Sequence, residues 1–148
     1  MVVRNIDEYQ EALKEMSRKA PNIDKALSLL RHSLRRGNPN AAYALGTWHL
    51  HGEHLPQDRK KAIALLRQAA KHNVPNALFD MAVCYEKGVG VRKSLASAFE
   101  YYLRAALHGE KQSVYEVGRC YYYGVGASAD RKVAKIWLGR AHELGITK

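Results

Sequence analysis

The chain has 148 residues, of which 47% are apolar and 26% are charged, and its formal net charge is +10. This length predicts one domain with a continuous core, and the composition is typical of a globular protein rather than of a disordered or fibrous one. No stretch is apolar over the roughly 20 residues that span a bilayer, and residues 1–8 lack the apolar segment of a secretion signal. We therefore expect a cytoplasmic protein without membrane contact.

The chain repeats itself with a period of 36 residues. Three sets at this spacing are Gly52, Gly88 and Gly124; Ala62, Ala98 and Ala134; and Tyr43, Phe79 and Tyr115. A period of this length indicates a solenoid, in which each unit buries its apolar face against its neighbours. The sequence thus predicts an extended surface suited to binding rather than an enclosed catalytic site.

The N-terminal segment predicts a degenerate helix pair over residues 6–19 and 22–36. Residues 25–31 match residues 61–67 in the 36-residue register, and Asn22 falls where Asp58 would cap the equivalent helix. Ala20 and Pro21 stand where the later units have a glycine loop. We expect this pair to cap the solenoid at its N-terminal end.

Each later unit predicts a first helix, a glycine loop and a second helix. The expected first helices are 39–51, 75–87 and 111–123, and the expected second helices are 58–72, 94–108 and 130–143. Glycine ends a helix well because it accepts positive φ, while Asp58, Ser94 and Asp130 can cap the second helices. We expect an all-α, right-handed solenoid of about four antiparallel helix pairs. It would comprise a cap at residues 1–38 and repeats at 39–74, 75–110 and 111–148.

The last helix pair keeps Ile136, Trp137 and Leu138, which are apolar residues at the C-terminal end of the solenoid. The C-terminal repeat could be covered by a partner, by a second copy in a homo-oligomer, or by nothing.

The two cysteines, Cys84 and Cys120, occupy one repeat position on neighbouring helices. Packed helices lie about 8–10 Å apart and a disulfide needs Cα atoms within about 7 Å, so we expect two buried thiols.

The third repeat carries the clearest motif, made of Val117, Gly118, Tyr121, Gly124, Gly126, Asp130, Ala134, Trp137, Ala141 and Gly145. This order resembles the Sel1-like repeat, a relative of the tetratricopeptide repeat. The resemblance covers residues 39–145 and departs at His49, His54 and Asn73 in the first copy and at Ser94 in the second. It implies a non-enzymatic adaptor that holds protein partners.

The same resemblance implies that the first helices line a concave groove, with positions 40, 43, 47 and 50 and their repeats facing it. An Asn/Gln ladder suits the backbone of an extended peptide, and neighbouring aromatic rings suit its side chains. Lys87 and Arg119 would add positive charge, which favours an acidic or extended segment of a partner protein. The aromatic residues could instead pack between adjacent units. The expected partner-binding residues are Asn40, Tyr43, Asn76, Phe79, Lys87, Gln112, Tyr115, Arg119 and Tyr122.

No nucleophile, base or metal set occurs at diagnostic spacing, so we expect no catalysis, no metal and no cofactor. His49 and His51 lie about 200° apart on a helix and would not share a metal.

Two other functions stay open. One is an immunity or antitoxin-like role in capturing a bacterial effector, and the other is nucleic-acid binding through a basic convex face. That second face would carry Arg59, Lys60, Lys61, Arg131 and Lys132, away from the tyrosines.

Overall fold

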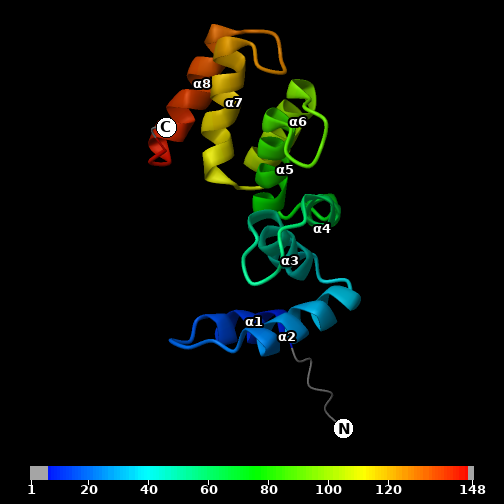
Figure 1. The fold of residues 1–148 in the computed structure, drawn as a ribbon. Coiled ribbons are helices and arrows are strands. Elements are labelled where there is room, and N and C mark those ends of the chain that lie inside the picture. The colour runs from blue at the N-terminus through cyan, green and yellow to red at the C-terminus, as the bar shows by residue number, and fades with distance from the viewer. Residues whose placement is uncertain (1–6, 147–148) are drawn as a thin grey trace.

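A computed structural model describes residues 7–146, and within them the chain forms eight α-helices and no strand. The helices pack as four successive pairs that stack from the N-terminal to the C-terminal end of an elongated molecule (Figure 1). Ile6, where the first helix was expected to begin, lies outside the described residues. The helices are α1 (Glu8–Met16), α2 (Ile23–Arg35), α3 (Pro39–His51), α4 (Arg59–Lys71), α5 (Pro75–Lys87), α6 (Leu95–Leu107), α7 (Lys111–Tyr123) and α8 (Arg131–Glu143).

The helix boundaries follow from capping residues that each unit supplies itself. The side chain of Asp58 accepts a hydrogen bond from the backbone N–H of Lys61 at 3.0 Å, and Asn22, Ser94 and Asp130 cap their helices in the same way. Gly52, Gly88 and Gly124 end α3, α5 and α7 in the left-handed conformation, with φ of 68°, 71° and 71°. The expected caps and the ends of the three first helices are confirmed, whereas α1 ends at Met16, with Ser17 as its C-cap, and not at the expected residue 19.

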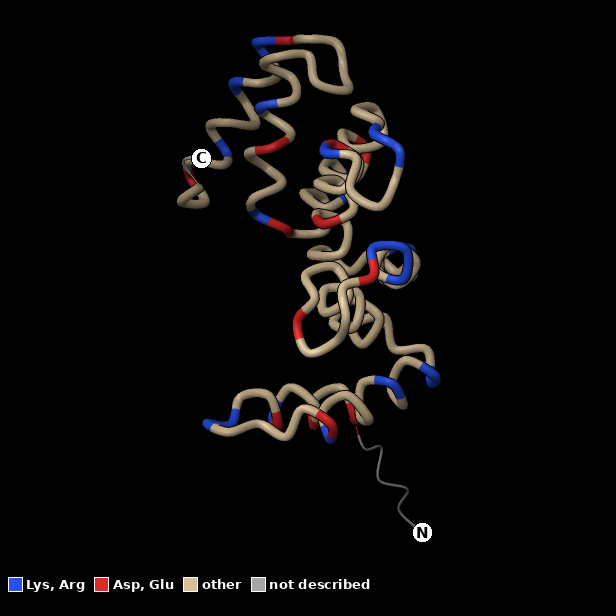
Figure 2. The backbone as a smooth tube through the Cα atoms, in the orientation of Figure 1, with Lys and Arg blue, Asp and Glu red and all other residues tan. Residues whose placement is uncertain are grey.

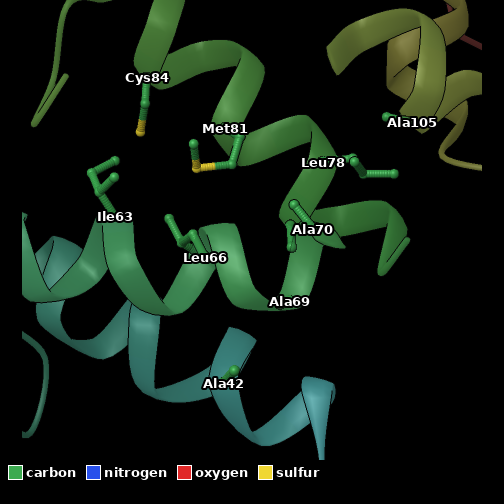
Figure 3. Close-up of a cluster of buried hydrophobic side chains, with 10 residues drawn as sticks. Ala42, Ile63, Leu66, Ala69, Ala70, Leu78, Met81, Cys84 and Ala105 are labelled. Atoms are coloured by element: carbon green, nitrogen blue, oxygen red, sulfur yellow. The ribbon is translucent and has the colours of Figure 1, made fainter. Parts of the chain in front are cut away.

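The core extends along the molecule as three clusters of buried residues, because the second helix of each unit packs on the first helix of the next. Figure 3 shows Ile63 and Leu66 of α4 facing Met81 and Cys84 of α5, while Leu78 of α5 points toward Ala105 of α6. Leu66, Leu78 and Met81 are fully buried. Cys84 and Cys120 are buried free thiols, as the sequence predicted.

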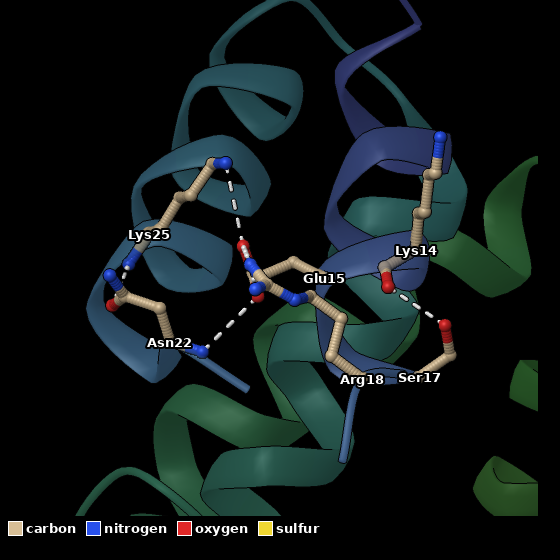
Figure 4. A network of polar contacts seen from close by, with 6 residues as sticks. All are labelled: Lys14, Glu15, Ser17, Arg18, Asn22 and Lys25. Atoms are coloured by element: carbon tan, nitrogen blue, oxygen red, sulfur yellow. Dashed lines mark hydrogen bonds and ion pairs between the residues drawn. The ribbon is translucent and has the colours of Figure 1, made fainter. Parts of the chain in front are cut away.

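The N-terminal pair is held by charged side chains in place of a glycine loop. Glu15 is only 4% exposed. Its carboxylate accepts hydrogen bonds from the backbone N–H of Asn22 at 3.3 Å and from Arg18 at 3.2 Å, and it pairs with Lys25 at 3.4 Å (Figure 4). These contacts join the end of α1 to the start of α2.

None of the helices in residues 7–146 has the length and apolar character that a membrane span requires.

Candidate functional site

The expected binding residues lie on the first helices of the three repeats. We call the face made by positions 40, 43, 47 and 50 and their equivalents the first-helix face. Helical spacing of three and four residues places these positions along one side of α3, α5 and α7. Leu50, Phe79 and Val83 line one hollow on this face, and Tyr115, Arg119 and Tyr122 line another.

One of these hollows lies between α3 and α5, and we call it the junction cleft. It has a volume of about 330 Å³. Phe79 and Lys87 of the expected set line it together with Leu50, Asp80 and Val83, and His51 and Arg59 stand at its exposed edge. The walls are mainly apolar, and Asp80 is the one carboxylate among the described residues that line the cleft.

Asp80 is a site residue that the sequence reasoning missed. The residues at its position in the three repeats are Ala44, Asp80 and Glu116, so no ladder of similar residues marked it. Its carboxyl is partly buried, and burial raises the pKa of Asp80 to about 6, although the charge of His51 and the hydroxyl of Tyr43 favour the ionised form. In turn, burial and then the negative charge of Asp80 raise the pKa of Tyr43 to about 12.

Arg119 is engaged by carboxylates of its own chain. Its Nε donates to Glu116 and its Nη2 donates to Glu86, both at 2.6 Å. The hydroxyl of Tyr102 donates to the same Glu86 carboxylate at 3.0 Å. These four residues form the arginine cluster between α5, α6 and α7. Of the two cations expected to attract an acidic partner, Lys87 is the one without an ion pair among residues 7–146.

Tyr115 and Tyr122 line a smaller hollow of about 140 Å³, together with Arg119 and Leu138. Tyr122 is covered on one side by Arg131, whose guanidinium carbon lies 3.9 Å from the ring centroid. The expected separation between the tyrosines and the basic residues of the second helices is therefore wrong at this place. Arg131 begins α8, directly after the loop that follows α7, and this brings its side chain back over the end of α7.

The remaining aromatic and amide positions have mixed surroundings. Tyr43 and Phe79 are partly buried and pack against the core between units, and the Phe79 ring lies 5.8 Å from that of Tyr102. Asn40 and Asn76 are exposed in the first turns of α3 and α5, and Gln112 is half-buried in that of α7. The packing role expected as the alternative is thus present for Tyr43 and Phe79.

Basic residues gather where the second helices begin. Figure 2 shows them at the start of α4 and in the loop before α6. Arg59, Lys60, Lys61, Arg92 and Lys93 are exposed and make no ion pair with another described residue.

Two histidines of the first repeat, His49 and His54, make local contacts. The His49 ring lies 3.2 Å from the carbonyl oxygen of Pro56, and the His54 ring packs on the edge of Trp48 at 4.8 Å. No group of three or more metal-ligating side chains occurs among residues 7–146.

These features define a class, the tandem helix-pair repeat proteins. The Sel1 repeat model matches residues 39–74, 75–110 and 111–146, which are the three units described above. The chain therefore belongs to the Sel1 repeat family. Proteins of this family generally mediate protein–protein interactions, and their fold is typically a scaffold without enzymatic activity.

Solved structures show the same fold. A protective antigen of uropathogenic Escherichia coli strains is 26% identical, with a TM-score of 0.87 over 93% of this chain and 30% of its own. A Sel1 repeat protein of Oxalobacter formigenes is 30% identical, with a TM-score of 0.81 over 94% of this chain and 41% of its own. An immunity protein of Pseudomonas aeruginosa is 20% identical, with a TM-score of 0.62 over 98% of this chain and 55% of its own. This chain thus spans less than half the length of the first two, and no curated protein matches it in sequence.

Proposed function

We propose that this chain is a non-enzymatic protein-binding scaffold that holds an extended segment of a partner along the first-helix face. The observation that carries the proposal is the junction cleft, which opens on that face between two repeats and has apolar walls and polar edges. Interface energy concentrates in a few well-packed residues, and aromatic residues are frequent among them. The proposed contact residues remain Asn40, Tyr43, Asn76, Phe79, Lys87, Gln112, Tyr115, Arg119 and Tyr122.

The charges of this face favour a segment of mixed rather than purely acidic composition. Asp80, Glu86 and Glu116 lie on it, and Arg119 is neutralised by two of them. Lys87 and Arg59 at the edge of the junction cleft can still attract acidic residues of the segment. Both cysteines are free thiols, which agrees with the reducing cytosol as the compartment.

Selection of peptides from a random library against the folded protein tests this proposal. We expect the selected peptides to bind at least about tenfold more weakly to a variant that combines Asn76→Ala with Gln112→Ala, because each amide would hold peptide backbone by hydrogen bonds. The matched control combines Lys60→Ala with Lys61→Ala, exposed residues of α4 that do not line the junction cleft, and it should leave the affinity unchanged. Fluorescence anisotropy measures the affinities, and circular dichroism checks that both variants fold.

The opposite pattern, in which the amide variant binds normally and the lysine variant does not, would overturn the choice of face. Such binding would then be compared at low and physiological salt, because affinity for nucleic acid falls steeply as counterions are released. The exposed basic residues at the start of α4 are the observation that keeps nucleic acid as a second candidate. The immunity-like role rests on a neighbour at 20% identity, which supports the fold alone.

A second copy of the chain is a further candidate partner, and it would bind the apolar residues that are exposed on the C-terminal repeat. Ile136 is 72% exposed and Leu138 is only partly covered. Light scattering over a range of concentrations would detect such self-association, and the peptide measurements would then be made where the chain is monomeric.

A further inference from the structure

The junction between the second and third repeats contains an arginine held in an enclosed site of its own. In the arginine cluster, the guanidinium of Arg119 lies between Glu116, three residues earlier on α7, and Glu86 at the end of α5. The Arg119 side chain is 25% exposed, and those of Glu86 and Glu116 are 23% and 17% exposed. This junction therefore shows how the fold accommodates an arginine between two units.

The preceding junction, between the first and second repeats, keeps the carboxylate of this arrangement but lacks the arginine. Subtracting 36 from each position replaces Glu116 by Asp80, Arg119 by Val83 and Glu86 by Leu50. These three residues line the junction cleft. The cleft thus corresponds to the space that Arg119 and its partner occupy in the next junction.

The Asp80 carboxylate lacks the cation that its counterpart has. It interacts with Tyr43 and lies in the field of His51, but it makes no ion pair with any Lys, Arg or His among residues 7–146. Leu50, Phe79 and Val83 provide apolar walls beside it. A partly buried carboxylate against apolar walls suits a cation whose long methylene stem packs on those walls.

We propose that the junction cleft binds an arginine side chain of the partner segment. Its guanidinium would pair with Asp80, as Arg119 pairs with Glu116 in the next repeat. Arginine fits better than lysine because its planar fork pairs with a carboxylate in two-pronged geometry and is more weakly hydrated. This inference rests on the proposed function and specifies which residue of the segment is recognised.

The cations at the edge of the cleft restrict what flanks that arginine. Lys87, Arg59 and His51 are exposed there, so their repulsion of the guanidinium is screened by solvent and salt. They would still disfavour a second basic residue beside it and favour acidic neighbours. The expected recognition element is therefore one arginine among neutral or acidic residues.

The direct test uses a small probe, N-acetyl-arginine N-methylamide, with the uncharged citrulline analogue of nearly the same shape as its control. We expect the arginine compound to shift the methyl resonances of Leu50 and Val83 and the carboxyl resonance of Asp80 saturably, and the citrulline compound to bind at least about tenfold more weakly. Equal shifts with the two compounds, or no saturable shift with either, would overturn the proposal.

Three variants sharpen this measurement. Asp80→Asn should lose the preference for arginine over citrulline, whereas Glu116→Gln, which alters the equivalent carboxylate one repeat further on, should keep it. Val83→Arg places an arginine three residues after Asp80, as Arg119 follows Glu116, and should exclude the probe from a chain that still folds. Retained probe binding in a folded Val83→Arg variant would contradict the proposed position of the guanidinium.

The peptides selected for the proposed function separate the two ideas. If they bind the first-helix face but tolerate replacement of arginine by citrulline, the scaffold function stands and this inference fails. If the arginine probe binds the cleft while no peptide binds that face, the cleft is as inferred and the proposed function fails.

Discussion

At Gly126, a single hydrogen atom in place of a side chain allows the third loop to lie against the preceding unit. A Cβ atom at this position would lie 2.0 Å from the carbonyl oxygen of Leu95 and 2.9 Å from the Cβ of Phe99, and φ is +69°. A backbone oxygen at the start of a helix cannot rotate away as the end of a flexible side chain can. The glycine is thus required both by its conformation and by the close approach of α6.

We predict that Gly126→Ala destabilises the protein by about 2–4 kcal/mol, because the new methyl group must displace backbone. The matched control is Gly139→Ala in α8, where a Cβ meets nothing within 4 Å. That change should stabilise the protein by up to about 1 kcal/mol, since alanine favours a helix over glycine. Urea unfolding followed by circular dichroism gives both values, and similar stabilities of the two variants would contradict the prediction.

The carboxyl of Asp80 makes stability depend on pH in an unusual direction for an acid. Its pKa is raised to about 6 in the folded chain, above the ordinary value of 3.8, mainly by burial. The folded state therefore binds more protons than the unfolded state between these two values, and this group lowers stability as pH rises from about 4 to about 6.

We predict that Asp80→Asn gains stability relative to the parent chain as pH rises, because the asparagine carries no charge to desolvate. The difference in free energy of unfolding, variant minus parent, should be about 1–2 kcal/mol larger at pH 7 than at pH 4. Urea unfolding of the two proteins at several pH values measures the difference in free energy of unfolding. A difference that stays constant from pH 4 to pH 7 would show that Asp80 is not desolvated as described.

Among the helices, the boundaries were predictable because their causes are local. The three first helices begin and end where the sequence predicts, and the repeat second helices begin one residue after their expected start, since the capping residue itself is not helical. The pairing of Arg119 with Glu86 was not predictable in the same way. These residues are 33 positions apart, and their contact depends on which turns of neighbouring helices meet.

For the candidate cleft, the sequence predicted two of the residues that line it but not the chemistry between them. The repeat register identified Phe79 and Lys87, which do line a cleft. It could not identify Asp80, whose equivalents differ in type, or the approach of Arg131 to Tyr122, which results from the course of a loop. Whether the amides bind a partner depends on that partner and is not encoded in the packing of this chain.

Over the whole molecule, the C-terminal end differs from the interior because no unit among the described residues covers it. Leu66, Tyr102 and Leu138 are equivalent by register. Leu66 is 0% and Tyr102 is 3% exposed, whereas Leu138 is only partly buried. In a solenoid, stability is approximately the sum of the units and the junctions between them. Within residues 7–146, the last unit therefore has one stabilising junction and the inner ones have two.

We predict that Leu66→Ala lowers the free energy of unfolding by about 3–4 kcal/mol and Leu138→Ala by about 1–2 kcal/mol, since only the first leaves a closed cavity. Denaturant unfolding compares the variants, and hydrogen exchange should show α7 and α8 losing protection before α4 and α5. Equal costs at the two leucines would indicate that the C-terminal face is covered in solution.

The reactivity of the two buried thiols reports local unfolding of the repeats. Cys84 and Cys120 are 2% and 0% exposed at equivalent positions of adjacent repeats, and burial raises the pKa of both to about 11. An alkylating reagent needs the exposed thiolate, so it modifies either residue only after the surrounding helices have separated. Once the helices around them have separated, both sulfur atoms react as ordinary solvent-exposed thiols. The ratio of their alkylation rates therefore measures, in the unsubstituted chain, how often the third repeat opens relative to the second.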